Sequence, residues 1–502
     1  MPANPNYPFW QRLKSCDAAL GGPHTDIAAL SLIETAERIQ LRELSCEEVT
    51  SAYLARIAAF DGRDRINSYL TLEPENALEQ ARHLDRMLGE DHYLGPLHGV
   101  PLGIKDALDT CDLRTTGGTK VLENWCPSID AAVVRQLREA GAVIIGKTNL
   151  HEACFGISSN NPHYGPVRNP YDYNRIPGGS SGGTSAAVSA RLCSAGLGTD
   201  TGGSVRIPSA LCGCVGLKPT LGRLNNTGMM SLSWTCDVNG PITRSVADAA
   251  LMLQIMSVRT AASPSDDDLA SLPDLVDDTA ALQGMKIGLV RGFFATDNDP
   301  AVDACVADVA QILERCGASI IEVTVPDIEL GVPAGFSIVV PEAIILTEQY
   351  WRTVDEHLRI EDQLENFGAD VKSVFAGERG ATAQPIPAHV YLEALTDQRP
   401  RICRGFERAL SAVDLLLTPT TPIPAVPIDE DVELILNGEP AASFSTFIRY
   451  TFGVSLAGLP AISVPGGQTD GGLPIGVQFI GRAWSEAKLI QAAWAYEVAV
   501  SS

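Results

Sequence analysis

Two serines, each preceded by a pair of glycines, are the residues of this sequence best suited to chemistry. Ser180 follows Gly178 and Gly179, and Ser204 follows Gly202 and Gly203. Glycine permits backbone shapes and close approaches that other residues resist, so a serine on such a loop can be aimed at a substrate. The pattern is typical of attack on a carbonyl, where backbone N–H groups stabilise the charge that develops on the oxygen.

A serine nucleophile also needs a group that takes its proton, and no histidine lies near either serine in the sequence. Lysine can be this base when burial lowers its pKa. Lys105 ends a short apolar run that begins at Val100, which is the setting that a desolvated base requires. Lys105 is therefore the candidate base.

The residues alone leave other interpretations open. A Gly-Gly-Ser stretch is often only a turn, and a lysine after an apolar run often reaches solvent at a strand end. Residues 178–182 also fit G-x-S-x-G, the nucleophile elbow of α/β-hydrolases, in which Ser180 would attack. That mechanism needs an acid and then a histidine downstream, and only His357 and His389 follow. A phosphate-binding loop is a further interpretation, but the glycine-rich stretch does not end in the Gly-Lys-Ser/Thr that such a loop requires.

The surrounding elements predict an α/β fold. A helix over 128–140 precedes a β-branched run at 142–147 that reads as a buried strand, and an Ala-rich buried helix is expected over 184–192. Ser45 and Glu48 have the form of a capping box that begins a helix reaching about Phe60. Further helices are expected at 26–39, 75–88, 244–255, 300–316 and 485–496, strands at 66–70, 285–290, 319–323, 415–419, 457–464 and 474–480, and a surface loop at 266–279.

Composition excludes several classes of protein. The 502 residues carry 37 basic and 61 acidic side chains, a net charge of −24, which argues against a broad nucleic-acid surface. The sequence has no run of eighteen apolar residues and no secretory pattern at its start, so we expect a cytoplasmic protein without a membrane span. The twelve cysteines are scattered without a CxxC pair, and no HExxH occurs, so we predict no metal and no cofactor.

Several motifs together resemble the amidase signature family. The separations of 24 residues between Ser180 and Ser204 and of 75 between Lys105 and Ser180 also agree with the family's triad. The resemblance extends from about residue 26 to the end of the chain, with a looser match in the middle. The matching stretches are residues 103–106, 177–183, 200–208, 213–220 and 240–248 and the two late strands.

The resemblance implies a Ser–cis-Ser–Lys triad. Ser204 would attack an amide carbonyl, and Ser180, after a cis bond from Gly179, would carry the proton to and from neutral Lys105. Backbone N–H groups of the loop that ends at Ser204 would form the oxyanion hole, from Thr201, Gly202 and Gly203 together with Ser204 itself. Five further residues would support these loops: Asp106, Ser181, Thr199, Asp200 and Arg206.

The same resemblance implies one domain over 1–502, a large mixed sheet sandwiched between helices. Its signature core would span about 95–250, and a helical insertion at about 325–400 would shape the substrate pocket. We expect this pocket to be apolar, with walls from Met229, Met230 and Trp234, from residues 336–350 and from residues 450–452.

We predict an enzyme that hydrolyses small apolar or aryl amides through an acyl-serine. Its partners would be a small-molecule amide and no nucleic acid, with a homodimer allowed. Three alternatives stay open: a carbamate or ester hydrolase with the same triad, a glutaminase-type amidotransferase subunit for tRNA-dependent amidation, and a non-enzymatic scaffold on the same fold.

Overall fold

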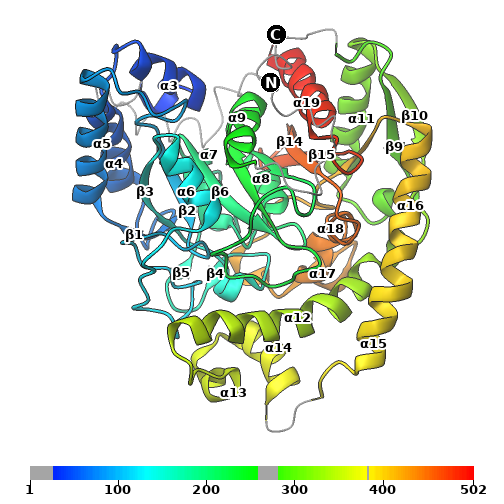
Figure 1. The fold of residues 1–502 in the computed structure, drawn as a ribbon. Coiled ribbons are helices and arrows are strands. Elements are labelled where there is room, and N and C mark those ends of the chain that lie inside the picture. Colours follow the sequence, from blue (N-terminus) through cyan, green and yellow to red (C-terminus); the bar gives the residue numbers. More distant parts are fainter. Residues whose placement is uncertain (1–26, 258–280, 381–383, 502) are drawn as a thin grey trace.

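The computed structural model describes residues 27–257, 281–380 and 384–501, and a mixed sheet of eleven strands runs through it (Figure 1). The surface loop expected at 266–279 lies outside the described residues. The strands follow the order β1-β3-β2-β6-β8-β7-β14-β15-β11-β9-β10. Their bounds are β1 Tyr69–Leu72, β2 Pro101–Lys105, β3 Val143–Thr148, β6 Ala195–Asp200, β7 Val215–Lys218, β8 Val238–Thr243, β9 Lys286–Val290, β10 Ser319–Val323, β11 Leu415–Pro419, β14 Ala461–Gln468 and β15 Pro474–Ile480.

The central strands β2 and β6 are parallel neighbours, with Leu102 opposite Ala195 and Ile104 opposite Leu197. Parallel strands end at the same edge of a sheet, so the residues that end β2 and β6 lie together. Lys105 is the last residue of β2 and Asp200 is the last residue of β6, so ionisable side chains gather at this edge of the sheet.

Helices cover both faces of the sheet, as predicted. On β3, Val143 and Ile145 pack on the side of α4, α5 and α7, whereas Ile144 packs on the side of α6, α9, α11 and α19. This alternation is the signature of a strand buried on both faces. The helices are α3 Leu32–Gln40, α4 Cys46–Phe60, α5 Pro74–Gly89, α6 Ala132–Glu139, α7 Gly182–Ser189, α8 Arg206–Cys212, α9 Val246–Met256, α11 Pro300–Arg315 and α19 Glu486–Ser501.

The capping box is confirmed at the start of α4. The Glu48 N–H donates to Ser45 Oγ at 3.1 Å, and the Ser45 N–H donates to Glu48 Oε2 at 2.8 Å. The start of α6 differs from the prediction, because the helix begins at Ala132 rather than at residue 128 and no side chain caps it. The Asp130 carboxylate instead accepts a hydrogen bond from Cys111 N at 2.7 Å and pairs with Arg138 at 3.0 Å.

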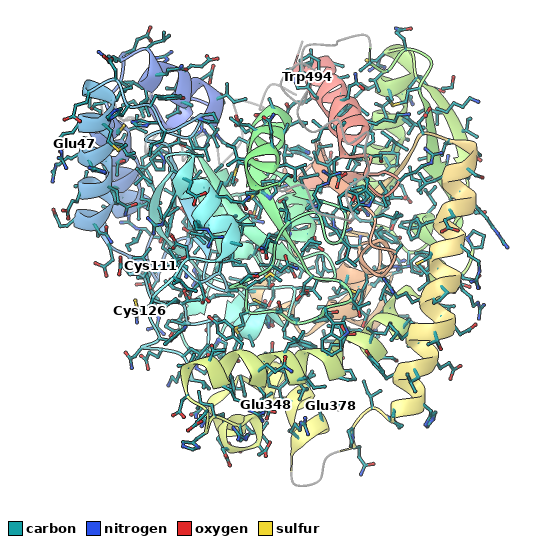
Figure 2. All side chains as sticks on the ribbon, viewed as in Figure 1. Glu47, Cys111, Cys126, Glu348, Glu378 and Trp494 are labelled. Carbon is teal, nitrogen blue, oxygen red and sulfur yellow. The ribbon has the colours of Figure 1, made fainter. Side chains whose placement is uncertain are left out.

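The region between β10 and β11 is helical, as expected. In Figure 1 its helices α12, α13 and α14 lie together at the end of the molecule opposite α19. Glu348 on α12, labelled in Figure 2, accepts a hydrogen bond from Ile360 N at 3.2 Å and so ties two of them together. The helices are α12 Gly331–Val354, α13 Ile360–Gln363, α14 Ala369–Arg379, α15 Ala388–Glu393 and α16 Arg399–Ala412, and two short helices follow at α17 Ser443–Ile448 and α18 Phe452–Leu456.

Among the described residues, one helical stretch, Ile328–Val354, is long and apolar enough to cross a membrane. The molecule itself buries 56% of its most apolar window. That burial is typical of a core helix, and α12 contributes Ile338, Val339 and Ala343 to the hydrophobic cluster beneath it.

Candidate active site

Lys105, Ser180 and Thr199 meet at the shared edge of β2 and β6. Lys105 Nζ lies 2.7 Å from Ser180 Oγ and 2.7 Å from Thr199 Oγ1. An amine has three substituent directions besides its carbon, and these two contacts take two of them. The arrangement therefore suits an exchange of a proton between the amine and the Ser180 hydroxyl.

The Lys105 side chain is fully buried, and burial lowers the pKa of its amine below the ordinary value for lysine. The thiol of Cys154 and the carboxylates of Asp200 and Asp237 oppose this shift. A buried amine without a contacting carboxylate loses its proton more readily than a free lysine, which is the property that a general base needs.

The loop before α7 presents Ser180, and the peptide bond from Gly179 to Ser180 is cis. Gly178 has a φ of +86°, and a Cβ there would lie 2.7 Å from Pro208 Cα. The sequence therefore needs glycine at this position, because the loop approaches the backbone of α8 too closely for a side chain.

The loop between β6 and α8 presents Ser204, which is half-buried while Thr201, Gly202 and Gly203 are buried. Gly203 has a φ of +143°, and a Cβ there would lie 2.3 Å from Thr451 Oγ1. The Thr451 hydroxyl donates to the carbonyl oxygen of Gly202 and so holds the peptide between Gly202 and Gly203 in place. Ser181 N donates to Ser204 O at 3.2 Å and joins the two serine loops.

Asp200 and Arg206 form a fully buried ion pair behind the Ser204 loop. Arg206 Nε lies 3.0 Å from Asp200 Oδ2, and its Nη2 lies 2.9 Å from Oδ1. The Arg206 guanidinium beside Asp200 outweighs burial and holds the pKa of this carboxyl below its usual range. Arg206 also donates to Thr451 O at 3.1 Å and to Ser455 Oγ at 2.9 Å, so it connects the loop to α18.

An Arg206→Met substitution is expected to lower the free energy of unfolding by about 3–5 kcal/mol, because it leaves Asp200 charged and buried without its partner. The matched control is Arg401→Met, whose pair with Asp327 is exposed to solvent, so the loss of stability should be far smaller than in Arg206→Met. Urea unfolding followed by circular dichroism measures both. Equal losses in the two variants would contradict a special role for the buried pair.

The remaining predicted supporting residues also lie close to the triad. Ser181 Oγ donates to Thr199 O at 3.2 Å, which links the loop before α7 to β6. Asp106 pairs with the buried Lys147 at 3.2 Å and accepts a hydrogen bond from Thr116 N at 2.9 Å. These contacts hold the ends of β2, β3 and β6 together beneath the triad.

A pocket of about 410 Å³, part of which is open to solvent, lies directly at Ser204. Residues 201–204 form one side and residues 154–157 another. The described lining contains no charged side chain, and its remaining members are Ile207, Leu232, Phe336, Val339, Phe444, Ile448 and Phe452.

The pocket prediction was right in part. Phe336 and Phe452 line it as expected, whereas Met229, Met230, Trp234 and Tyr450 are not among its described lining residues. Met230 packs against Gly117, Trp234 is 55% exposed, and the Tyr450 hydroxyl bonds to Asn298 Oδ1 at 2.6 Å.

Sequence reasoning missed the wall at residues 154–157 and the aromatic and aliphatic residues of α17. Phe444 lies 5.2 Å from Phe336 between ring centroids, and 6.2 Å from Phe155. The sequence did contain a feature that could have identified residues 154–157. Residues 149–157 connect a predicted strand to the Ser180 loop, and loops that follow strands often carry binding or catalytic residues. Among the described residues, no group of three His, Cys, Asp or Glu side chains is placed to hold a metal ion.

Comparison with known proteins identifies the family. The family model described as Amidase matches residues 48–490. The chain belongs to the amidase signature family. The sequence is 39% identical over 482 residues to a glutamyl-tRNA(Gln) amidotransferase subunit of Carboxydothermus hydrogenoformans, covering 93% of this chain and 96% of the relative. It is 40% identical to the protein of the same name from Moorella thermoacetica, with coverage of 93% and 96%.

A solved structure agrees with this assignment. The native peptide amidase of Stenotrophomonas maltophilia superposes with a TM-score of 0.81 at 34% identity, covering 93% of this chain and 96% of that one. The predicted α/β fold, a large mixed sheet between helical layers, is therefore confirmed. The chain is an amidase-family enzyme of the class that cleaves carbon–nitrogen bonds.

The prediction about partners was wrong. We expected a small-molecule amide and no nucleic acid, and we allowed for a homodimer. Relatives with 39–40% identity over nearly their whole length are named as one subunit of an enzyme for glutamyl-tRNA(Gln). Net charge misled the prediction, because the charge of one chain carries no information about what the other members of an assembly bind.

Proposed function

We propose that the chain hydrolyses a carboxylic amide through an acyl-enzyme on Ser204. The contact of 2.7 Å between buried Lys105 Nζ and Ser180 Oγ carries this proposal, since it supplies a base next to a hydroxyl that can pass a proton on. Ser204 Oγ attacks the carbonyl carbon and its proton passes through Ser180 to Lys105. The N–H groups of residues 201–204 receive the negative charge on the carbonyl oxygen.

The second half of the reaction reverses the proton path. The tetrahedral intermediate collapses, the C–N bond breaks, and Ser180 delivers the proton to the leaving nitrogen. Water then attacks the acyl-ester, which releases the acid and restores the Ser204 hydroxyl. Thr199 Oγ1 lies 2.7 Å from Lys105 Nζ. This contact holds the amine in the orientation in which it also contacts the Ser180 hydroxyl.

We propose as the first candidate that this reaction releases ammonia within an amidotransferase acting on glutamyl-tRNA(Gln). The identity of 39–40% over 93% of this chain to one subunit of such enzymes supports this proposal over a free-standing linear amidase. The chain would then work with partner subunits, and its amide would be glutamine.

One observation favours a second candidate, hydrolysis of an uncharged apolar amide. Free glutamine carries an ammonium and a carboxylate, and groups of this kind need polar or charged partners when they are desolvated. The described pocket lining holds aromatic and aliphatic side chains and no charge. An aryl or alkyl acyl group fits such a lining, and an apolar carbamate or ester fits it equally well.

Ammonia release by the purified chain distinguishes the candidates, with glutamine, phenylacetamide and ethyl carbamate as substrates. A kcat/KM for glutamine above that for phenylacetamide, together with amidation of glutamyl-tRNA once partner subunits are added, would establish the first candidate. Phenylacetamide or ethyl carbamate turnover with glutamine inert would establish the second. A chain that hydrolyses none of them and does not react with a fluorophosphonate would contradict both.

Phe336→Ala is expected to lower kcat/KM for phenylacetamide by about 10- to 100-fold under the second candidate. The variant removes apolar contact of about 1.5–3 kcal/mol from the pocket. Ile345→Ala on the same helix is the control, because Ile345 is 40% exposed and is not among the described lining residues. An unchanged kcat/KM in Phe336→Ala would exclude binding of the acyl group against α12.

A further inference from the structure

Asp237 is a buried carboxylate that the triad does not use. It lies directly before β8 and is 4% exposed. Its Oδ2 accepts hydrogen bonds from Leu232 N at 2.7 Å and from Ser233 N at 2.9 Å. Two successive backbone N–H groups thus orient the carboxylate and leave Oδ1 for one further partner.

That partner is the first residue of the Ser204 loop. Thr201 Oγ1 donates to Asp237 Oδ1 at 2.6 Å. The rest of the loop is held by Thr451, which bonds to the carbonyl oxygen of Gly202, and by the Arg206 pair with Asp200. Asp237 is therefore the anchor at the end of the loop where the chain leaves β6.

We propose that Asp237 is a positioning residue for amide hydrolysis. It holds Thr201 so that the N–H groups of the Ser204 loop face the developing oxyanion, and its charge acts on the Lys105 amine. This inference rests on the proposed attack by Ser204 and applies to either candidate substrate. Because the oxyanion donors work only when they are fixed before the reaction, a loosened loop should lower kcat far more than substrate binding.

The charges around Asp237 determine its effect on pH dependence. The groups that interact electrostatically with Asp237 are the Lys105 amine, the Glu342 carboxylate and the thiols of Cys154 and Cys236. Burial raises the pKa of Asp237 to about 6, and the Glu342 carboxylate acts in the same direction. Asp237 is thus ionised at neutral pH, and its negative charge raises the pKa of Lys105.

Glu342 connects this network to the wall of the pocket. It belongs to α12 and accepts a hydrogen bond from Thr235 Oγ1 at 2.6 Å and another from the Ser233 hydroxyl. Residues 232–237 are therefore held between α12 on one side and the Ser204 loop on the other. Asp237 needs this support, because its two backbone donors belong to the same segment.

The test compares Asp237→Asn with Thr201→Val and measures kcat, KM and the pH profile of each. In Asp237→Asn, an amide N–H₂ replaces an acceptor and the negative charge is lost. We expect kcat to fall by about 100-fold with KM changed less than about threefold. The acid limb of kcat/KM should move to lower pH, since Lys105 loses a nearby negative charge.

Thr201→Val keeps the carboxyl of Asp237 and removes only the hydroxyl donor, whose hydrogen bond lowers the pKa of that carboxyl. We expect a similar loss of kcat with a smaller movement of the acid limb than in Asp237→Asn, and the double variant should lose little more than either single variant. Asp248→Asn is the matched control. Asp248 is also buried and also accepts from two successive backbone N–H groups, Leu32 N at 3.2 Å and Ile33 N at 3.1 Å, but these belong to α3 and not to the segment that holds the Ser204 loop. The Asp248→Asn variant should be less stable than the wild-type protein, but its kcat and its acid limb should be unchanged.

Two results would overturn the inference. One is a kcat in Asp237→Asn or Thr201→Val that equals the wild-type value per folded molecule. The other is an acid limb of Asp237→Asn that coincides with that of Asp248→Asn. The wild-type rate in the same assay tests the proposed hydrolysis separately, so a failure of the proposed function is visible on its own.

Discussion

A Ser204→Ala variant should hydrolyse the amide substrate at least about 10⁴-fold more slowly than the wild-type enzyme. Removal of a serine nucleophile leaves only the contribution of the oxyanion donors and of substrate binding. Ser204 is half-buried at the mouth of the apolar pocket, where an amide carbonyl can reach it, whereas Ser180 is 1% exposed and contacts Lys105. The difference in exposure supports the proposal that Ser204 attacks and that Ser180 transfers the proton.

Labelling with a fluorophosphonate, followed by peptide mass spectrometry, checks this assignment directly. The adduct should lie on Ser204 in the wild-type enzyme and disappear in Ser204→Ala. Ser158→Ala is the control, because Ser158 is buried outside the described pocket lining and donates to Asp431 Oδ2 at 3.1 Å. An adduct on Ser180 that survives in Ser204→Ala would reverse the two roles and restore the nucleophile-elbow interpretation of residues 178–182.

Strands with β-branched or apolar runs were predictable from the sequence, and the glycine-rich strands were not. Residues 142–147 and 285–290 are short apolar runs, and they correspond to β3 and β9. The central β6 reads Ala-Gly-Leu-Gly-Thr-Asp and carries little strand signal. Its glycines serve packing, since a Cβ at Gly196 would lie 2.3 Å from Thr184 Cγ2 on α7.

The candidate site also contains residues that could be predicted from the sequence and residues that could not. The spacing of the motifs identified the residues on the loops, because these loops are local structures with a fixed sequence pattern. Contacts from distant segments left no such pattern: Thr451 and Ser455 hold Arg206 from some 245 residues away, and Phe444 lines the pocket from a stretch without a motif. Partner choice was not predictable either, because the motifs describe the reaction that the whole family shares.

Lys105→Ala should reduce turnover by several orders of magnitude and remove the acid limb of the pH profile. In the wild-type enzyme, burial lowers the pKa of Lys105, so the neutral amine is present at lower pH than in a free lysine. Activity should therefore rise as the pH increases through the pKa of the folded protein, since only the neutral amine accepts the proton from Ser180. Initial rates measured across the acid, neutral and alkaline range give this limb.

Added alkylamine separates a lost base from a damaged fold. Lys105→Ala leaves a space beside Ser180, and ethylamine or propylamine placed there should restore part of kcat, with a pH dependence that follows the added amine. The control is Lys147→Met, a buried lysine on the adjacent strand that pairs with Asp106 at 3.2 Å. This variant should lose stability and keep the acid limb, because Asp106 is left unpaired while Lys105 is intact. Full activity in Lys105→Ala, or equal pH profiles in both variants, would exclude Lys105 as the base.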